Sequence, residues 1–224
     1  MGCKFCASTI GGRIRDLSAG EILSEIMVAQ KFLGERISNV VLMGSGEPLD
    51  NYDNVVKFLR ILSEKEDMSL RHVSVSTCGL VNRIYELADL KLGITLSVSL
   101  HAPTNKLRSS VMPVNDRYPI EELMKACRYY FDTTGRRISY EFALIDGVND
   151  NRESADALIK LLRGQNCHVN LIPVNEIKEG VFRRSESVEK FKQMLIDGGL
   201  NATVRRTLGA DISAACGQLR RDNN

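Results

Sequence analysis

The sequence lacks the features that mark a membrane-bound, secreted or extended protein. Across its 224 residues, no apolar run approaches the roughly 18 to 20 residues that cross a bilayer. The chain does not open with a basic segment followed by an apolar one, as a secretory leader would. Low-complexity tracts and long linkers rich in Pro, Gly or Ser are also missing. We therefore expect one globular domain over residues 1–224, in the cytosol and without a membrane partner.

Charge of one sign and cysteine are scarce as well. The formal net charge of +2 does not by itself favour a nucleic-acid partner, although arginine pairs recur along the chain. Six cysteines, at positions 3, 6, 78, 127, 167 and 216, are too sparse for a disulfide scaffold. In a reducing compartment such cysteines serve metal, redox or catalytic chemistry, or lie buried as small apolar side chains. We expect the buried, apolar case for Cys127 and Cys167.

Short β-type runs alternate with longer helical ones along the chain. Apolar residues that return every three or four positions predict helices over 19–33, 55–64, 81–87, 120–132, 154–162 and 188–197. Runs of β-branched and apolar residues predict strands over 40–43, 72–77, 94–100, 138–144, 169–172 and 202–205. Strict alternation implies parallel strands joined by right-handed crossovers, in an open α/β sheet or a barrel.

In either architecture the reactive groups gather where the strands end. Small and polar residues follow four of the strands, in the stretches GSGEP (44–48), STCG (76–79), SLH (99–101) and PVN (173–175). We therefore expect a site at this edge. The loop 3–12 stands where a first βα loop belongs, and no strand precedes it in this sequence. We expect the chain to be truncated inside a β/α unit, with its first strand missing.

The pair Cys3 and Cys6 is compatible with three kinds of chemistry. Zinc would need four ligands, and no second Cys-x-x-Cys follows. A redox dithiol should open a helix, whereas a small-residue loop follows here. An iron–sulfur cluster suits thiolates placed close together on a loop, and an iron left without a protein ligand can bind substrate. Spacing alone does not decide between them.

Three other residues are candidates for the site. Gly44-Ser45-Gly46 lacks the third glycine of a dinucleotide fingerprint. Glu47, which follows it, could accept hydrogen bonds from a ligand's ammonium group, or it could simply lie in an exposed turn. His101 ends an apolar strand, where it could contact a ligand or be a buried, hydrogen-bonded core residue. Cys216 lies among small neighbours that leave its sulfur accessible.

Seven motifs, taken together, resemble one known family in order and in spacing. They are CKFCASTIGG, MGSGEPLDN, VSTCG, SVSLHAP, GRRISYEFALIDGVND, CHVNLIPVN and GADISAACGQL, and they cover essentially the whole chain. On these motifs the sequence is similar to the radical S-adenosylmethionine (SAM) methyltransferases that modify adenine C2 in 23S rRNA and tRNA, the RlmN type. The resemblance implies an α/β fold, a partial (β/α)6 barrel of the radical SAM type.

The resemblance also implies the cofactors, a 4Fe-4S cluster and SAM. In the family's Cys-x-x-x-Cys-x-x-Cys motif, Cys3 and Cys6 match the second and third cysteines, and the first would precede this chain. Gly46 and Glu47 would meet the methionine end of SAM. The other implied SAM contacts are Ser76 on the ribose side, Ser99, Leu100 and His101 on the adenosine side, and Asn175.

By the same resemblance, Cys216 is the methyl carrier. Its thiolate would take a methyl group from one SAM, and a radical made from a second SAM would activate that group for addition to adenine C2. That carbon is too electron-poor to attack a methyl sulfonium directly. A second cysteine and an RNA-binding extension of the family would precede this chain, so we expect the segment to be inactive alone. The family usually has serine at the position of Cys78.

The resemblance makes 23S rRNA and tRNA the partners, held through their phosphates. The arginine pairs at 136–137, 205–206 and 220–221 are candidate contacts, and the target adenine would leave its stack to reach the site. An electron donor such as flavodoxin or ferredoxin and a monomeric state are also expected. Two alternatives stay open: an adenine C8 methyltransferase of 23S rRNA that confers antibiotic resistance, and a non-catalytic metal- or RNA-binding module.

Overall fold

The computed structural model describes residues 1–9, 12–43, 45–66, 68–174 and 182–206. Its strands are β1 (Val40–Leu42), β2 (Val73–Thr77), β3 (Thr95–Ser99), β4 (Ile138–Leu144), β5 (Cys167–Pro173) and β6 (Ala202–Val204). Its α-helices are α1 (Ala19–Leu33), α2 (Tyr52–Lys65), α3 (Val81–Asp89), α4 (Asn105–Val111), α5 (Ile120–Thr134), α6 (Arg152–Leu162) and α7 (Val188–Asp197). Short 3-10 helices are η1 (Ala7–Thr9), η2 (Pro48–Asn51), η3 (Leu70–His72) and η4 (Pro113–Asp116).

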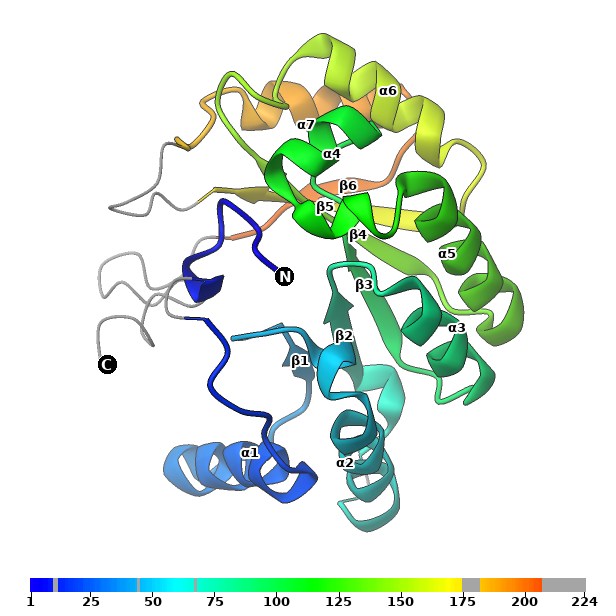
Figure 1. Ribbon diagram of the computed structural model, residues 1–224. Helices are drawn as coiled ribbons and strands as arrows, with labels where there is room; N and C mark the ends of the chain where they lie inside the picture. Colours follow the sequence, from blue (N-terminus) through cyan, green and yellow to red (C-terminus); the bar gives the residue numbers. More distant parts are fainter. Residues whose placement is uncertain (10–11, 44, 67, 175–181, 207–224) are drawn as a thin grey trace.

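The strands form one parallel sheet in the order β1-β2-β3-β4-β5-β6. Each strand pairs with the next one along the chain, because each is followed by a crossover that contains a helix. The sheet is curved, the helices lie along its outer side, and the N-terminal segment lies on its open inner side (Figure 1). This confirms the predicted fold class, a partial β/α barrel.

Local sequence explains where the helices begin and end. The Ser18 hydroxyl accepts from the Glu21 N–H (3.3 Å) and the Glu21 carboxylate accepts from the Ser18 N–H (2.8 Å), so a capping box starts α1. Gly34, at φ 68°, ends it in the left-handed conformation. The predicted bounds of α1, α7 and β4 are confirmed, while α6 begins two residues early because Asn151 caps it. Helix α4 was not predicted.

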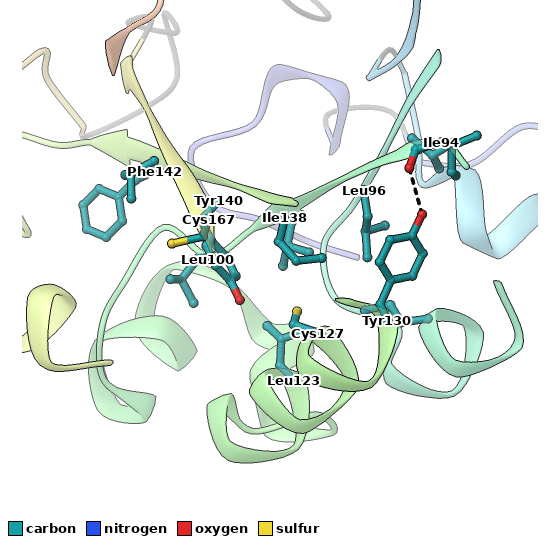
Figure 2. Packing of buried hydrophobic residues seen from close by; sticks show 14 of the residues in the cluster. Ile94, Leu96, Leu100, Leu123, Cys127, Tyr130, Ile138, Tyr140, Phe142 and Cys167 are labelled. Atoms are coloured by element: carbon teal, nitrogen blue, oxygen red, sulfur yellow. Dashed lines mark hydrogen bonds between the residues drawn. The ribbon is translucent and has the colours of Figure 1, made fainter. Parts of the chain in front are cut away.

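The main core lies between the sheet and its outer helices. Alternate residues of β4 and β5 point into it, and Figure 2 shows Tyr140, Phe142 and Cys167 among the packed side chains. Cys127 of α5 is also in this core, so the expectation of buried, apolar thiols at both cysteines is confirmed. The Tyr130 hydroxyl donates to the Ile94 carbonyl (3.0 Å), which satisfies its one polar atom (Figure 2).

The inner face of the sheet is polar. Buried polar side chains there include Ser76, Ser97 and Glu141, which alternate along their strands with core residues. Across the open side, the Arg205 guanidinium beyond β6 lies 2.9 Å from the Met43 sulfur beyond β1. No helix in the described part of the chain is long and apolar enough to cross a membrane.

Candidate active site

The N-terminal loop folds back on itself around its two cysteines. The Cys6 N–H donates to the Cys3 carbonyl (3.2 Å), and the Thr9 N–H and hydroxyl both donate to the Cys6 carbonyl (3.2 and 2.8 Å). The Lys4 N–H donates to the Val111 carbonyl at the end of α4 (3.0 Å). The two thiols therefore lie on one tight loop that is fixed against the fold.

Cys3 is buried in a small apolar cluster where the strands end. The members of this rim cluster are Cys3, Cys78, Val111, Met112, Val114, Ile145 and Val174. Burial, and then the nearby Cys6 thiol, raise the pKa of Cys3 to about 11. A soft metal ion would reverse this effect, because its positive charge stabilises both thiolates.

The loop fits a bound iron–sulfur group in part. The Ser8 hydroxyl oxygen, two residues after Cys6, is buried and has no hydrogen-bond partner within the described ranges, as expected where a loop closes around a bound group. Over the same ranges, no group of three His, Cys, Asp or Glu side chains could hold a metal ion. Cys3 and Cys6 could therefore supply two thiolates to a metal, and a further ligand would be needed.

Glu47 lies beside this loop with its carboxylate fixed by backbone N–H groups. One oxygen accepts from the Leu49 N–H (3.0 Å), at the start of η2, and the other from the Cys78 N–H just beyond β2 (2.7 Å). Burial raises the pKa of Glu47, and these two bonds oppose the shift. Gly46 before it has φ 107°, which favours glycine. The carboxylate is a fixed acceptor for a cationic group rather than part of a freely solvated turn.

Arg108 is a buried cation that sequence reasoning missed. It is 0% exposed, and it donates to the carbonyls of Cys78 (2.7 Å), Ser99 (3.1 Å) and Leu100 (3.1 Å) and to the Asn115 side-chain oxygen (3.1 Å). It therefore joins the ends of β2 and β3 to α4. A cation beside Leu107 and Ser109 on a short helix gives no periodic signal of burial, so only the three-dimensional structure reveals it.

Gly79 makes room for this guanidinium. Its φ is 104°, and a Cβ atom there would lie 3.3 Å from Arg108 Nη2 and 3.0 Å from Leu123 Cδ1. The Cys78 backbone between them donates to Glu47 and accepts from Arg108. The Cys78 backbone in the STCG stretch therefore links an anion, Glu47, to a cation, Arg108.

His101 is a buried, hydrogen-bonded residue, as one of the two interpretations of its sequence expected. It is 6% exposed, its Nδ1 accepts from the Ala143 N–H (2.8 Å), and its carbonyl accepts from Asn149 Nδ2 (2.9 Å). Its ring meets Phe5 edge-on, with centroids 4.7 Å apart, so it also touches the cysteine loop. Burial lowers the pKa of His101 to about 3. The ring is therefore neutral at pH 7 and keeps one N–H, on Nε2.

The other predicted SAM contacts within the described residues, Ser76, Ser99 and Leu100, differ in what they can offer a ligand. Ser76 and Ser99 lie on the inner face of the sheet with hydroxyl groups available to a ligand. The Leu100 side chain is in the main core, its N–H donates to the Glu141 carbonyl (3.0 Å), and its own carbonyl accepts from Arg108 and Ala102. Leu100 can therefore make only van der Waals contact with a ligand.

A polar network backs the site on the inner face. The Glu141 carboxylate accepts from Ser139 (3.1 Å) and from Asn170 (2.7 Å), and burial raises its pKa. Sequence reasoning did not single out this residue, although the alternation of Ser139 and Glu141 along an apolar strand was an available signal.

The other residues that the sequence suggested either lie outside the described part of the chain or lie at one end of a strand. Asn175, Cys216 and the pair at 220–221 lie outside the described residues. Arg136 bonds the Thr95 hydroxyl (3.0 Å) at the opposite, N-terminal end of the strands. Arg205 lies at the carboxyl end of β6.

Sequential parallel strands, with a thiol pair and a fixed carboxylate at their carboxyl ends, are the arrangement of a β/α barrel with its site on the rim. The family model described as "Radical SAM superfamily" matches residues 1–159, so the chain belongs to that superfamily. Its cofactors are SAM and a 4Fe-4S cluster, as the motifs implied.

The similar proteins point to one branch of this superfamily. The chain is 60% identical over 225 residues to a probable dual-specificity RNA methyltransferase RlmN of Clostridium beijerinckii, covering 99% of this chain and 64% of the relative. It is 57% identical to the protein of the same description in Clostridium novyi, covering 99% of this chain and 66% of the relative. The chain thus spans just under two thirds of the curated relatives it matches, and the resemblance drawn from the motifs is confirmed.

A solved structure agrees with both findings. The crystal structure of a radical SAM methyltransferase from Sphaerobacter thermophilus has a TM-score of 0.93 and 47% identity, and the match covers 97% of this chain and 66% of that one.

Proposed function

We propose that this chain is the radical SAM portion of a cytosolic enzyme that methylates adenine C2 in 23S rRNA and tRNA. The observation that carries the proposal is the meeting of the cysteine loop, Glu47 and His101 at one rim, through the Glu47–Cys78 bond (2.7 Å) and the Phe5–His101 contact (4.7 Å). The relatives described as dual-specificity RNA methyltransferases support RNA as the substrate.

The residues at the rim divide the binding of the two cofactors. Cys3 and Cys6 would hold the cluster as two of its thiolate ligands, and the Glu47 carboxylate would accept hydrogen bonds from the ammonium group of SAM. The cluster and SAM, when bound, supply one-electron chemistry and the methyl group. The neutral His101 ring presents an N–H rather than a second positive charge, which suits contact with a sulfonium ligand.

The inner face of the sheet would receive the adenosine side of SAM. Ser76 and Ser99 would offer hydroxyl groups there, and Asn175 follows β5 in the sequence. Leu100 supports this side through its backbone bonds to Glu141 and Arg108.

Cys216 carries the methyl group in this proposal. Its thiolate would attack the methyl carbon of SAM, with S-adenosylhomocysteine as the leaving group, and the methylated sulfur would hold that carbon for adenine C2. The enzyme acts as a monomer and takes electrons from a flavodoxin or ferredoxin.

The first test concerns the cluster. The chain is extended to place a cysteine at the first position of the Cys-x-x-x-Cys-x-x-Cys motif, and both proteins are reconstituted without oxygen. We expect a reduced 4Fe-4S electron paramagnetic resonance signal that shifts with SAM in the extended protein alone. Stoichiometric zinc, or no cluster in either protein, would return the function to a binding module.

The second test concerns the methyl carrier. In the full-length enzyme, Cys216→Ala should abolish methylation of rRNA and tRNA, whereas Cys127→Ala, in the main core, should leave it. The site of the product's new methyl group separates C2 from C8. Methylation that survives Cys216→Ala would contradict the assigned role.

A further inference from the structure

The arginine pair Arg183-Arg184 follows Phe182, which packs at the rim of the candidate site. Both side chains are exposed, and neither takes part in an ion pair or a side-chain hydrogen bond within the described residues. By contrast, several other exposed arginines, such as Arg13, Arg15 and Arg152, are already paired with carboxylates. Two positive charges therefore remain available to an anionic partner.

The backbone that carries these arginines is fixed to the rim. Arg184 forms an antiparallel bridge with Ile145, directly after β4, and the Asp146 N–H donates to the Arg183 carbonyl (3.0 Å). The Ser185 hydroxyl, 1% exposed, donates to the Asp150 carboxylate (2.7 Å). The backbone of both arginines is thus held in place before any partner arrives, which lowers the entropy lost on binding.

The same segment touches the candidate active site. Phe182 packs against the rim cluster, which also contains Cys3 and Ile145. Along this stretch Phe182 packs inward, Arg183 and Arg184 are exposed to solvent, and Ser185 is buried. This places a pair of guanidinium groups at the edge of the surface where a target base would enter.

We propose that Arg183 and Arg184 bind the phosphates that flank the target nucleotide of the RNA substrate. This inference rests on the proposed function, because RNA is the partner that the function supplies. A base that leaves its stack keeps its backbone attached, so its neighbouring phosphates approach the rim of the pocket that receives the base. Guanidinium groups suit phosphate oxygens because they donate paired hydrogen bonds.

The pair serves this role better than the pairs that the sequence suggested. Arg136 is bonded at the far end of the barrel, and Arg205 contacts Met43 and lies close enough to Glu141 to lower its pKa. Arginine pairs that look the same in the sequence therefore lie on different parts of the surface in the folded protein.

The test measures binding of an unmodified tRNA transcript to this chain by fluorescence anisotropy over a range of salt concentrations. Arg183→Ala with Arg184→Ala should weaken binding about tenfold at low salt and reduce the slope of log K against log salt by roughly 1.4, the value for two single-strand phosphate contacts. The matched control is Arg128→Ala with Arg163→Ala, an exposed arginine of α5 and the exposed C-cap residue of α6. It removes the same charge and should change affinity less than twofold.

Three results would overturn the proposal. They are no binding of tRNA by the unchanged chain, an equal loss in the test and control variants, and a loss of binding to polyglutamate without a loss for tRNA, which would indicate an acidic protein partner. Replacement of both residues by lysine should keep most of the affinity, and melting temperatures should not change.

Methylation by the full-length enzyme is measured separately. A double-alanine enzyme with raised KM for RNA and unchanged kcat supports the proposal, whereas absent methylation in the unchanged enzyme defeats the proposed function and leaves the anisotropy comparison standing.

Discussion

Replacing Arg108 by methionine tests the internal support of the rim. Methionine keeps much of the volume of the side chain and removes its charge and all its donors. Four acceptors then lose a bond, namely the carbonyls of Cys78, Ser99 and Leu100 and the side-chain oxygen of Asn115. The Leu100 carbonyl keeps a second bond, from the Ala102 N–H (2.8 Å). Because Arg108 is fully buried, water cannot readily replace it.

The magnitude follows from two opposing effects. Burial lowers the pKa of Arg108, which shows that its charged form is poorly solvated. Removing this buried cation therefore relieves a desolvation cost and by itself would stabilise the fold. Leaving a buried acceptor without a donor costs about 1 to 3 kcal/mol each. We expect the second effect to win and the free energy of unfolding to fall by about 3 to 5 kcal/mol, a large share of the 5 to 15 kcal/mol typical of a domain.

Urea denaturation followed by circular dichroism measures this change. Arg108→Lys retains the charge and up to three donors, so it should lose less, about 1 to 3 kcal/mol. Arg128→Met removes an exposed arginine from α5 and should stay within about 0.5 kcal/mol. A loss below about 1 kcal/mol for Arg108→Met would refute the reasoning, because it would mean that the carbonyls find other donors.

Three further changes test the geometry of the chain. Gly79→Ala should cost about 1 to 3 kcal/mol more than Gly164→Ala in urea denaturation, because both have positive φ but only the first would place Cβ 3.0 Å from Leu123. Lowering the pH from about 6 to 4 should reduce the unfolding free energy by about 1.4 kcal/mol per pH unit through His101, and His101→Gln should remove this component. The folded-state pKa of that histidine is about 3, so only the unfolded chain takes up the proton in this interval. Ser18→Ala should lower the unfolding free energy by about 1 kcal/mol, measured in the same way, and an unchanged midpoint would contradict the capping box.

The order of strands and helices could be predicted because burial imposes a period on the sequence. The bounds of α1 and β4 follow from long, clear patterns and from the caps beside them. Helix α4 has only seven residues, too few to show a period, and its buried face includes a cation. Short elements of this kind depend on tertiary contacts, which a local pattern does not contain.

The candidate site was predictable where residues follow strands and less so elsewhere. Glu47 and His101 lie at strand ends, and parallel strands bring all such ends to one edge. The support of those residues comes from distant parts of the chain, as in the bond between Asn149 and the His101 carbonyl or between Arg108 and Cys78. For the arginine pairs, composition is the same at each, and only their place relative to the sheet distinguishes Arg183-Arg184 from Arg136-Arg137.

The sequential order of the sheet has a consequence for how the protein is made. Each strand is added at the edge next to the strand synthesised before it, so no strand must later insert between two others. Contacts between successive β/α units are short in sequence separation, which favours rapid folding. The rim residues Glu47, Cys78 and His101, with the β4 backbone that holds His101, all precede residue 146. The central part of the site can therefore assemble while the last third of this segment is still being synthesised.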